Sequence, residues 1–509
     1  MKVFLALLIL VLPLSAADRR LLPKEALLDK IRGGWAGQMF GVVYGGPTEF
    51  RALGTTYDGG QVGTPGNLKD ALDQDDLYVE MTLAEVMDSE GLNATSEQYG
   101  LAFRDSKYRL WHANLSARRN LARGIKAPDS GHPRYNAHAN DIDFQIESDF
   151  LGLMSPGLPR AVQFFADRVG RVMNYGDGLY GGVFIGAMYA AAFFEDDPRR
   201  VVEAGLAAIP ERSAYAAVIR ETLAWRQQFP GDWRAAWKQI VDKWDRDDVC
   251  PEGAHSPFNI DAKLNGAFVA LGLLYGERDF ERTMEISMRA GQDSDCNPSN
   301  AAGILGVMLG YSNLPGRWTE ALEPLKREKF KYTNFSFDSI VASTLSRAAN
   351  VVERYGGRVT PDGLEIPDQA PEALKLEQWE PGQPAGSLPV TDAARWTWKG
   401  QWARTEGGRV SAYTDEAGAE ATVTFEGTGA ILVGSWREDG GYAEVYLDGR
   451  KVADTDGYVA GGNRDAESLW HADGLPAGTH VLRIVVSGRR YPRSRGAFIY
   501  LQRLIVLRK

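Results

Sequence analysis

The segment GGWAGQMFGVVYGGPTE, residues 33–49, places four glycines, Gly33, Gly37, Gly41 and Gly45, at intervals of four residues. This spacing puts all four on one face of a helix. Each glycine costs a helix about 1 kcal/mol relative to alanine, so four in register need a compensating reason. We expect the backbone of another element to approach this face closely, and we predict a tightly packed, all-helical body.

Helical periodicity continues through residues 18–355, and no regular series of alternating strands interrupts it. The clearest predicted helices are Ala161–Met173, Gly181–Phe194, Arg199–Ala208, Ala214–Gln228, Trp233–Trp244, Ala262–Tyr275 and Phe280–Ala290. Gly356-Gly357 and several prolines then predict a linker over residues 356–390 that runs over the surface.

Residues 391–509 change to a period of two, which predicts an antiparallel β-sandwich of the jelly-roll kind. The predicted strands are Ala421–Phe425, Ala430–Trp436, Ala443–Leu447, Lys451–Ala453, His480–Val486 and Phe498–Leu507, with a hairpin turn at Asp448-Gly449. Five tryptophans, Trp396, Trp398, Trp402, Trp436 and Trp470, are interpreted mainly as core residues, with sugar stacking as the alternative. The segments 427–429, 446–449 and 478–480 resemble galactose-binding-like accessory domains of secreted glycosidases, which implies a carbohydrate-binding role.

Residues 1–17 have the pattern of an export signal. Lys2 precedes the mostly apolar run Val3–Leu14, and Ser15-Ala16-Ala17 offers small residues for cleavage. This run is too short to span a bilayer; an uncleaved anchor is the alternative. We therefore expect a secreted or periplasmic protein without a membrane span in its mature form.

The composition excludes some partners. Among 509 residues the net charge is −10, so no basic surface is expected for nucleic acid. The two cysteines, Cys250 and Cys296, leave a disulfide open as an alternative. Zinc on thiolates is not expected, because no Cys/His cluster has ligand spacing along the chain.

Two acidic motifs, Asp75-Asp76 and Asp293-Ser294-Asp295, stand beside apolar helical sequence. If the fold brings them together, each carboxylate pair near 4 Å repels by about 4 kcal/mol at an effective dielectric of about 20. A hard cation such as magnesium, manganese or calcium relieves this repulsion when the carboxylate oxygens bind it. Four negative charges balance two divalent ions, so we predict a binuclear metal site.

Three motifs in order resemble those of the ADP-ribosylglycohydrolases. They are the glycine-rich helix ending in Gly45-Gly46-Pro47-Thr48-Glu49, then Gln74-Asp75-Asp76-Leu77, and finally Asp293-Ser294-Asp295-Cys296 followed by a glycine-spaced helix. The resemblance implies an all-α catalytic domain with two magnesium ions, or manganese, in a central cleft. It implies Asp75, Asp76, Asp293 and Asp295 as metal ligands, with Asp76 also serving catalysis, and Glu49 as the catalytic glutamate.

Four positions depart from the family's motifs. Gln74 and Leu77 replace threonines, Cys296 replaces the last threonine, and Val42 replaces an aspartate. Gln74 retains a hard oxygen ligand, whereas the Cys296 thiol suits softer metals. We keep both in the predicted ligand set and expect the second metal site to be weaker, altered or absent.

Further candidates for substrate contact are Asp143, Asp177, Tyr180 and His255. Asp143 shares a helix face with Glu147, four residues on. Asp177 and Tyr180 fall where the family has a substrate-contacting loop, while His255 has an ordinary loop role as its alternative.

Neighbouring polar residues have structural interpretations. Asp141 is either a cleft residue or a helix-start cap, and Asp73 is a helix N-cap or dipole partner. The segment 129–131 is interpreted first as a turn, with a binding loop as the alternative. His112, His132 and His138 lack metal spacing among themselves.

Together these features predict an exported, magnesium-dependent hydrolase that cleaves an N- or O-glycosidic bond of an ADP-ribosyl or related glycosyl substrate with a metal-activated water. The alternatives are a glycosidase acting on a different glycoside or a nucleoside, and a non-catalytic glycan-binding protein.

Overall fold

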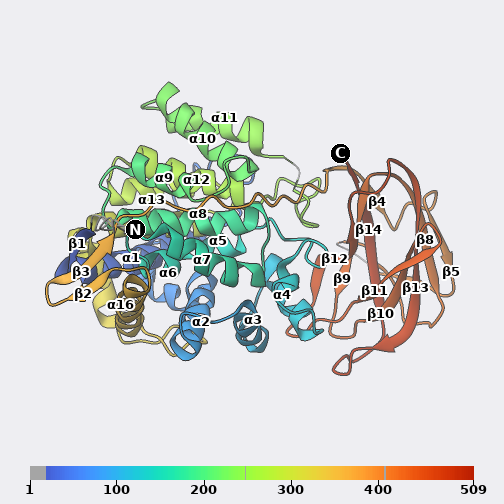
Figure 1. Ribbon diagram of the computed structural model, residues 1–509. Coiled ribbons are helices and arrows are strands. Elements are labelled where there is room, and N and C mark those ends of the chain that lie inside the picture. The colour runs from blue at the N-terminus through green and yellow to red at the C-terminus, as the bar shows by residue number, and fades with distance from the viewer. Residues whose placement is uncertain (1–18, 247, 406–408) are drawn as a thin grey trace, which may run out of the picture.

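The computed structural model describes residues 19–246, 248–405 and 409–509, so the predicted signal segment 1–17 lies outside the described residues. A helical body is joined to a β-domain, as Figure 1 shows in blue to yellow and in red. The helices are α1 (Lys24–Gly45), α2 (Asp75–Glu90), α3 (Ser96–Asp105), α4 (His112–Ala122), α5 (Asp143–Ile146), α6 (Asp149–Leu153), α7 (Pro159–Val169), α8 (Asp177–Ala192), α9 (Pro198–Ala207), α10 (Ala214–Gln228), α11 (Trp233–Trp244), α12 (Ala262–Gly276), α13 (Phe280–Arg289), α14 (Cys296–Leu309), α15 (Gly316–Leu322) and α16 (Phe337–Arg354). The all-α prediction for this part is confirmed, and all seven predicted helices are present. Among the helices of the described part, none has the length and apolar character required to cross a bilayer.

Helix α1 packs along α14, and the glycine face is the contact. A Cβ added at Gly33, Gly37, Gly41 or Gly45 would meet a backbone oxygen at 2.1, 2.2, 2.2 and 2.0 Å, respectively. These oxygens belong to residues spaced by four in the opposite direction, namely Gly306, Ala302, Pro298 and Ser294. The predicted close approach is confirmed, and its partner is the segment that begins with the second acidic motif.

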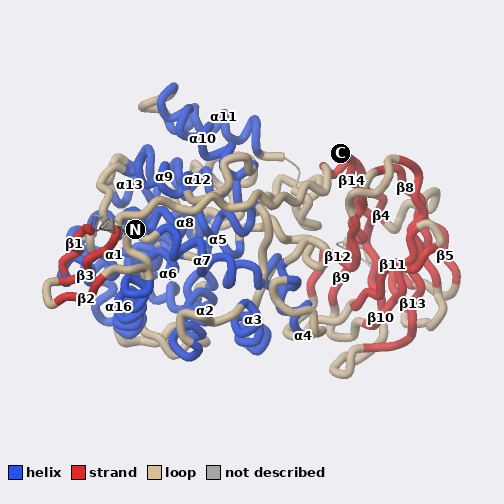
Figure 2. The backbone as a smooth tube through the Cα atoms, in the orientation of Figure 1, coloured by secondary structure: helices blue, strands red, loops and turns tan. Residues whose placement is uncertain are grey.

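The predicted linker contains strands that the sequence pattern did not predict. Strands β2 (Arg358–Thr360) and β3 (Gly363–Pro367) form a small antiparallel sheet with β1 (Arg19–Pro23), which is the one strand before the linker in the described chain. The chain then crosses the helical body as an extended segment without regular structure (Figure 2). The Tyr180 hydroxyl accepts from Glu377 N at 2.6 Å, and Arg171 pairs with Glu377 at 2.9 Å, so side chains of the body hold this segment.

The β-domain consists of two antiparallel sheets, which confirms the all-β prediction. One sheet has the order β11 (Arg450–Asp456), β10 (Gly441–Leu447), β13 (Gly478–Arg490), β8 (Glu420–Gly427) and β5 (Trp396–Lys399). The other has the order β12 (Arg464–Ala472), β9 (Gly429–Trp436), β14 (Ile499–Arg508), β7 (Ala412–Thr414) and β6 (Ala403–Arg404), and β4 (Gln383–Pro389) also pairs with β14. Strand β4 lies within the predicted linker, so pairing begins before residue 391.

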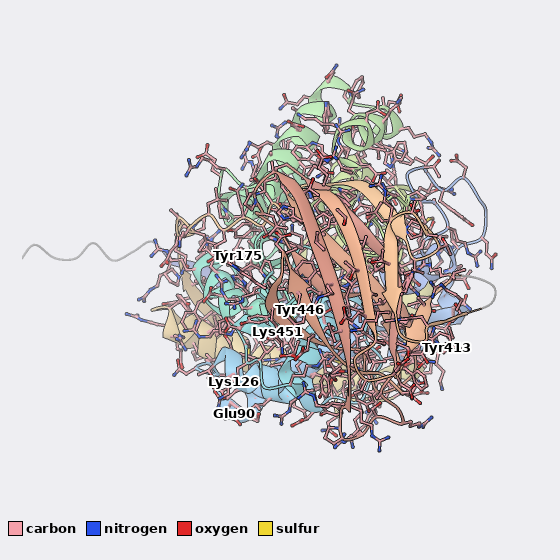
Figure 3. All side chains as sticks on the ribbon, turned by 90° about the vertical axis from the view of Figure 1, so that its right-hand side faces the viewer. Glu90, Lys126, Tyr175, Tyr413, Tyr446 and Lys451 are labelled. Carbon is pink, nitrogen blue, oxygen red and sulfur yellow. The ribbon has the colours of Figure 1, made fainter. Side chains whose placement is uncertain are left out.

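The predicted hairpin is present at Asp448-Gly449, where both residues have positive φ, 50° and 79°. It places Tyr446 opposite Lys451 on the outer sheet, which faces the viewer in Figure 3. Trp396, Trp436 and Trp470 are buried, whereas Trp398 and Trp402 are partly exposed, so the core interpretation holds for most of the tryptophans.

An arginine connects the two domains. The Arg119 guanidinium of α4 lies 3.3 Å from the Trp436 ring centroid and donates to the carbonyl oxygens of Asp456, at 2.8 Å, and Tyr458, at 3.1 Å. A planar guanidinium satisfies both kinds of contact at once. The β-domain is therefore packed directly against the helical body beside the cleft described next.

Candidate active site

Both acidic motifs and the glycine-rich turn open into one cavity of about 460 Å³. Glu49 follows the turn after α1, Gln74 and Asp75 stand at the start of α2, and the second motif stands at the start of α14. The lining comprises Glu49, Phe50, Asp73, Gln74, Asp75, Tyr78, Trp111, His112, Asn114, Ile142, Asp143, Ile146, Glu252, Phe258, Ile260, Asp293, Asp295 and Cys296. We call this cavity the acidic pocket.

The α1–α14 contact brings the catalytic turn to the second motif. A Cβ at Gly45 would lie 2.0 Å from Ser294 O and 2.5 Å from the Asp295 Cα, so only glycine fits there without a shift. Thr48 donates to Gly45 O at 2.7 Å and shares a 2.8 Å hydrogen bond with the Ser294 hydroxyl. The glycine face and this hydroxyl pair thereby position Glu49 beside Asp293 and Asp295.

Cys296 links the two acidic motifs. Its Sγ donates to Asp76 Oδ1 at 3.2 Å and lies 3.7 Å from Asp295 Oδ1. Asp76 is 1% exposed and lies beneath the pocket surface, and its Oδ2 has no hydrogen-bond partner among the described residues. A buried carboxylate oxygen without a partner carries a large desolvation cost, and this burial, together with the nearby Asp75 and Asp295, raises the pKa of Asp76 well above its usual range.

The electrostatics of the pocket favour a cation. Burial, followed by repulsion from Asp295, raises the pKa of Asp75 to about 6, and burial with the same repulsion raises the pKa of Asp293 well above its usual range. Glu49 reaches solvent, yet repulsion from Asp295, then burial, then repulsion from Asp75 raises its pKa. No Lys or Arg is found among the described residues that line the pocket.

The donor set fits a hard divalent ion. Carboxylate oxygens of Asp75, Asp293 and Asp295 share one pocket, and one oxygen of Asp293, one of Asp295 and the Cys296 sulfur lie within 4.8 Å of one another. Such oxygens suit magnesium or manganese. The Cys296 pKa is raised by burial and by the nearby aspartates, so its neutral thiol is a poor ligand for such an ion.

The pocket also has an apolar wall that the sequence pattern did not indicate. Phe50 and Phe258 pack with their ring centroids 4.8 Å apart, and Trp111 is 38% exposed at the pocket. These residues come from loops, where neither periodicity nor a recognised motif marks them. Aromatic faces of this kind suit a sugar or a base.

Asp143 lies in the pocket as predicted, but its carboxylate is engaged. It accepts from the backbone N–H groups of Asn114, at 2.9 Å, and Ala113, at 3.3 Å, in the first turn of α4. Glu147 is buried below it and accepts from the Asn114 amide. Asp143 therefore fixes the start of α4 as well as lining the pocket.

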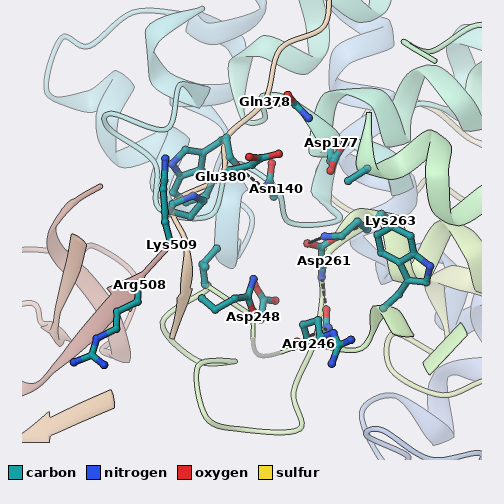
Figure 4. Close-up of a pocket in the computed structure, with 18 of the residues that line it drawn as sticks. Asn140, Asp177, Arg246, Asp248, Asp261, Lys263, Gln378, Glu380, Arg508 and Lys509 are labelled. Carbon is teal, nitrogen blue, oxygen red and sulfur yellow. Dashed lines mark hydrogen bonds and ion pairs between the residues drawn. The ribbon is translucent and has the colours of Figure 1, made fainter. Parts of the chain in front are cut away.

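The other three substrate candidates are outside the acidic pocket. Asp177 lines a second cavity of about 560 Å³ (Figure 4), accepts from Tyr215 N at 3.2 Å, and shares that cavity with Asp261 and Lys263. Tyr180 is buried and binds the extended segment, and His255 is exposed on a loop. None of the three is among the described residues lining the acidic pocket, so their contact with the substrate stays a prediction.

Several structural interpretations are also tested. Segment 129–131 forms a short turn as predicted, but Gln74 rather than Asp73 is the N-cap of α2, and Asp73 pairs with Lys331 at 2.7 Å. Asp141 caps no helix, because Ile142 is the N-cap of α5 and no side chain caps it. Cys250 and Cys296 are both free, so no disulfide joins them.

The sequence model of the ADP-ribosylglycohydrolases matches residues 23–351, which span the helical body and all three motifs. This chain belongs to the ADP-ribosylglycohydrolase family. Family membership makes it a glycosidic-bond hydrolase of this class, with the acidic pocket at the position of the shared motifs. No curated protein sequence matches the chain.

Solved structures similar to parts of the chain include an ADP-ribosylglycohydrolase-related protein complex, at 17% identity and a TM-score of 0.41, covering 64% of this chain and 99% of that one. A Paenibacillus xanthan lyase has 7% identity and a TM-score of 0.21, covering 29% of this chain and 15% of that one. The CBM36-1 domain of a multidomain xylanase from the hindgut metagenome of Trinervitermes trinervoides has 12% identity and a TM-score of 0.18, covering 23% of this chain and 93% of that domain.

Proposed function

We propose that this member of the family is an exported, magnesium-dependent hydrolase that cleaves the glycosidic bond at the anomeric carbon of an ADP-ribosyl or related ribosyl substrate. The observation that carries the proposal is the convergence of Glu49 and both acidic motifs on one pocket whose described lining has no basic counter-charge. A non-catalytic glycan-binding role gives no reason to gather these carboxylates against their mutual repulsion.

Asp75, Asp76, Asp293 and Asp295 would hold the metal, with the Gln74 amide oxygen beside them. Magnesium bound there supplies charge neutralisation, orients sugar hydroxyls and lowers the pKa of water. Cys296 stands where the family has a hydroxyl, and we propose that it weakens the second metal site.

Glu49 would handle the proton of the attacking water. Its side chain is exposed at the pocket that also contains Asp75 and Asp295, where a carboxylate can accept a proton from water. The transition state of such a cleavage has oxocarbenium character, which the surrounding carboxylates stabilise. The Phe50–Phe258 wall would hold the face of the sugar or base and exclude water from that side.

Turnover of ADP-ribosyl-serine, ADP-ribosyl-arginine and a panel of nitrophenyl glycosides, with and without magnesium, tests the proposal. Glu49→Gln should lower kcat by about 10²–10⁴-fold while magnesium still raises the melting temperature. Asp75→Asn combined with Asp295→Asn should abolish both turnover and the magnesium effect. Asp73→Asn is the matched control, since Asp73 lines the pocket but is exposed and paired with Lys331.

Two outcomes would overturn this assignment. Full activity in the Asp75/Asp295 double variant would remove the metal-dependent mechanism. Absence of turnover on every substrate, together with glycan-array binding by the full chain, would favour the non-catalytic alternative. Export is tested separately by N-terminal sequencing of the mature protein, which should begin at Asp18.

A further inference from the structure

Four side chains of different segments meet beside the acidic pocket. His112 begins α4, His138 and Asp141 lie in the loop before α5, and Cys250 lies in the loop between α11 and α12. One ligand atom from each lies within 4.8 Å of the other three, and His138, Asp141 and Cys250 are buried. We call these four residues the His–Cys cluster.

The contacts within the cluster converge on one ring nitrogen. His138 Nδ1 is 2.8 Å from Asp141 Oδ2 and 3.3 Å from Cys250 Sγ. A hydrogen on Nδ1 satisfies one of these neighbours well, not both. A catalytic relay would place the thiol and the carboxylate on opposite ring nitrogens, so the geometry does not suit a cysteine nucleophile.

The opposite ring nitrogen has a different environment. His138 Nε2 lies 3.6 Å from Glu467 Oε2 of strand β12, beyond hydrogen-bond distance. Among the described residues neither atom has a hydrogen-bond partner, although His138 is 2% exposed and Glu467 is 8% exposed. In metal sites a ligating histidine donates its other N–H to a carboxylate, which fixes the tautomer. With a metal on Nδ1, the hydrogen moves to Nε2 and points at Glu467.

We propose that His112, His138, Asp141 and Cys250 form a zinc-class metal site, with Glu467 of the β-domain as the outer carboxylate of His138. A thiolate, a carboxylate and two neutral imidazoles balance one divalent ion without residual charge, which suits a buried position. Thiolate and imidazole ligands select zinc over magnesium. Zinc ligands at about 2.0–2.3 Å stand about 3.3–3.8 Å apart in a tetrahedron. Side-chain movements of about 1 Å would therefore separate the His138–Asp141 pair, now at 2.8 Å, and draw in ligand atoms that lie up to 4.8 Å apart.

The proposed zinc site would hold in place a loop that lines the acidic pocket. Cys250 precedes Glu252, Phe258 and Ile260, which line the acidic pocket, and His112 lines that pocket itself. Fixing Cys250 to the body would hold this loop as a wall of the cleft, and the Glu467 contact would secure the β-domain at the same point. The inference does not depend on the proposed reaction.

Cobalt substitution of the chelator-treated full-length protein tests the site, because a Co²⁺–thiolate bond gives a near-ultraviolet charge-transfer band. About one equivalent of Co²⁺ should produce the band, and excess magnesium should leave it unchanged. Cys250→Ser should abolish the band, whereas Cys296→Ser, which changes the other buried cysteine, should retain it. A wild-type protein without the band, or a band lost in Cys296→Ser and kept in Cys250→Ser, overturns the proposal.

The role of Glu467 is tested by zinc affinity, measured by competition with a chromophoric chelator. Glu467→Gln should weaken zinc binding by about 10–100-fold. Glu444→Gln is the control, because Glu444 lies on the same domain but pairs with Lys451 at 2.8 Å. Equal zinc affinity in Glu467→Gln and wild type would remove Glu467 from the site.

Discussion

Substituting Gly37 by alanine tests whether backbone contact between α1 and α14 holds the helical body together. The added Cβ would stand 2.2 Å from Ala302 O, 2.6 Å from Ala302 C and 2.7 Å from the Gly303 Cα, all of them backbone atoms. No side-chain rotation relieves such contacts, so the helices must separate by about 1 Å, which forfeits about a quarter to a half of each nearby dispersion contact. The structure therefore predicts overpacking rather than cavity filling.

The two opposing effects are unequal. Alanine gains about 1 kcal/mol over glycine in a helix, whereas overpacking of a dense core typically costs about 1–3 kcal/mol and occasionally more. Because three backbone atoms are struck at once, we expect the clash to prevail and the free energy of unfolding to fall by about 2 kcal/mol. Gly46→Ala is the control, since nothing lies within 4 Å of its added Cβ.

Calorimetry of the full chain measures both variants, because it resolves the transitions of separate domains. Gly37→Ala should lower the melting temperature of the helical body by several degrees, and Gly46→Ala should leave it nearly unchanged. Equal melting temperatures for the two variants would refute the argument, since only helix propensity would then matter.

Three further outcomes follow from the charges. Asp295→Asn should raise the melting temperature of the metal-free protein, because it removes repulsion with Glu49 and Asp75; a decrease would contradict the electrostatic account. Arg119→Lys loses the planar contact between the domains, worth about 1 kcal/mol, and should move their calorimetric transitions further apart; a profile identical to wild type would argue against it. The Asp448–His480 hydrogen bond raises the pKa of His480 and lowers the pKa of Asp448. The stabilisation from this charged pair is therefore present between about pH 4 and 6.5. It is lost as the pH rises through the His480 pKa, and also as the pH falls through the Asp448 pKa. Asp448→Asn, which preserves the turn preference, should therefore lower β-domain stability at pH 5.5 more than at pH 8.5 in thermal melts, and an equal loss at both would exclude the charge effect.

The local pattern of residues determined much of this protein. The glycine spacing predicted a close backbone contact, because a Cβ-free stripe on a helix has no other physical justification. The β-domain strands and the Asp448-Gly449 turn followed from alternation and from the need for positive φ. The acidic motifs predicted a shared metal-binding pocket, because carboxylates that converge repel one another and a shared cation relieves this repulsion.

Tertiary structure alone decided which neighbours complete each site. Asp177 and Tyr180 both lie in the first turn of α8, yet Asp177 lines a second cavity and Tyr180 binds the extended segment that crosses the helical body. His138 and Cys250 lie in loops and His112 is the first residue of α4, so no periodicity relates these side chains to one another. Periodicity reports which face of one element is buried, whereas a site is made where the ends of several elements meet, and that meeting depends on how the whole chain packs.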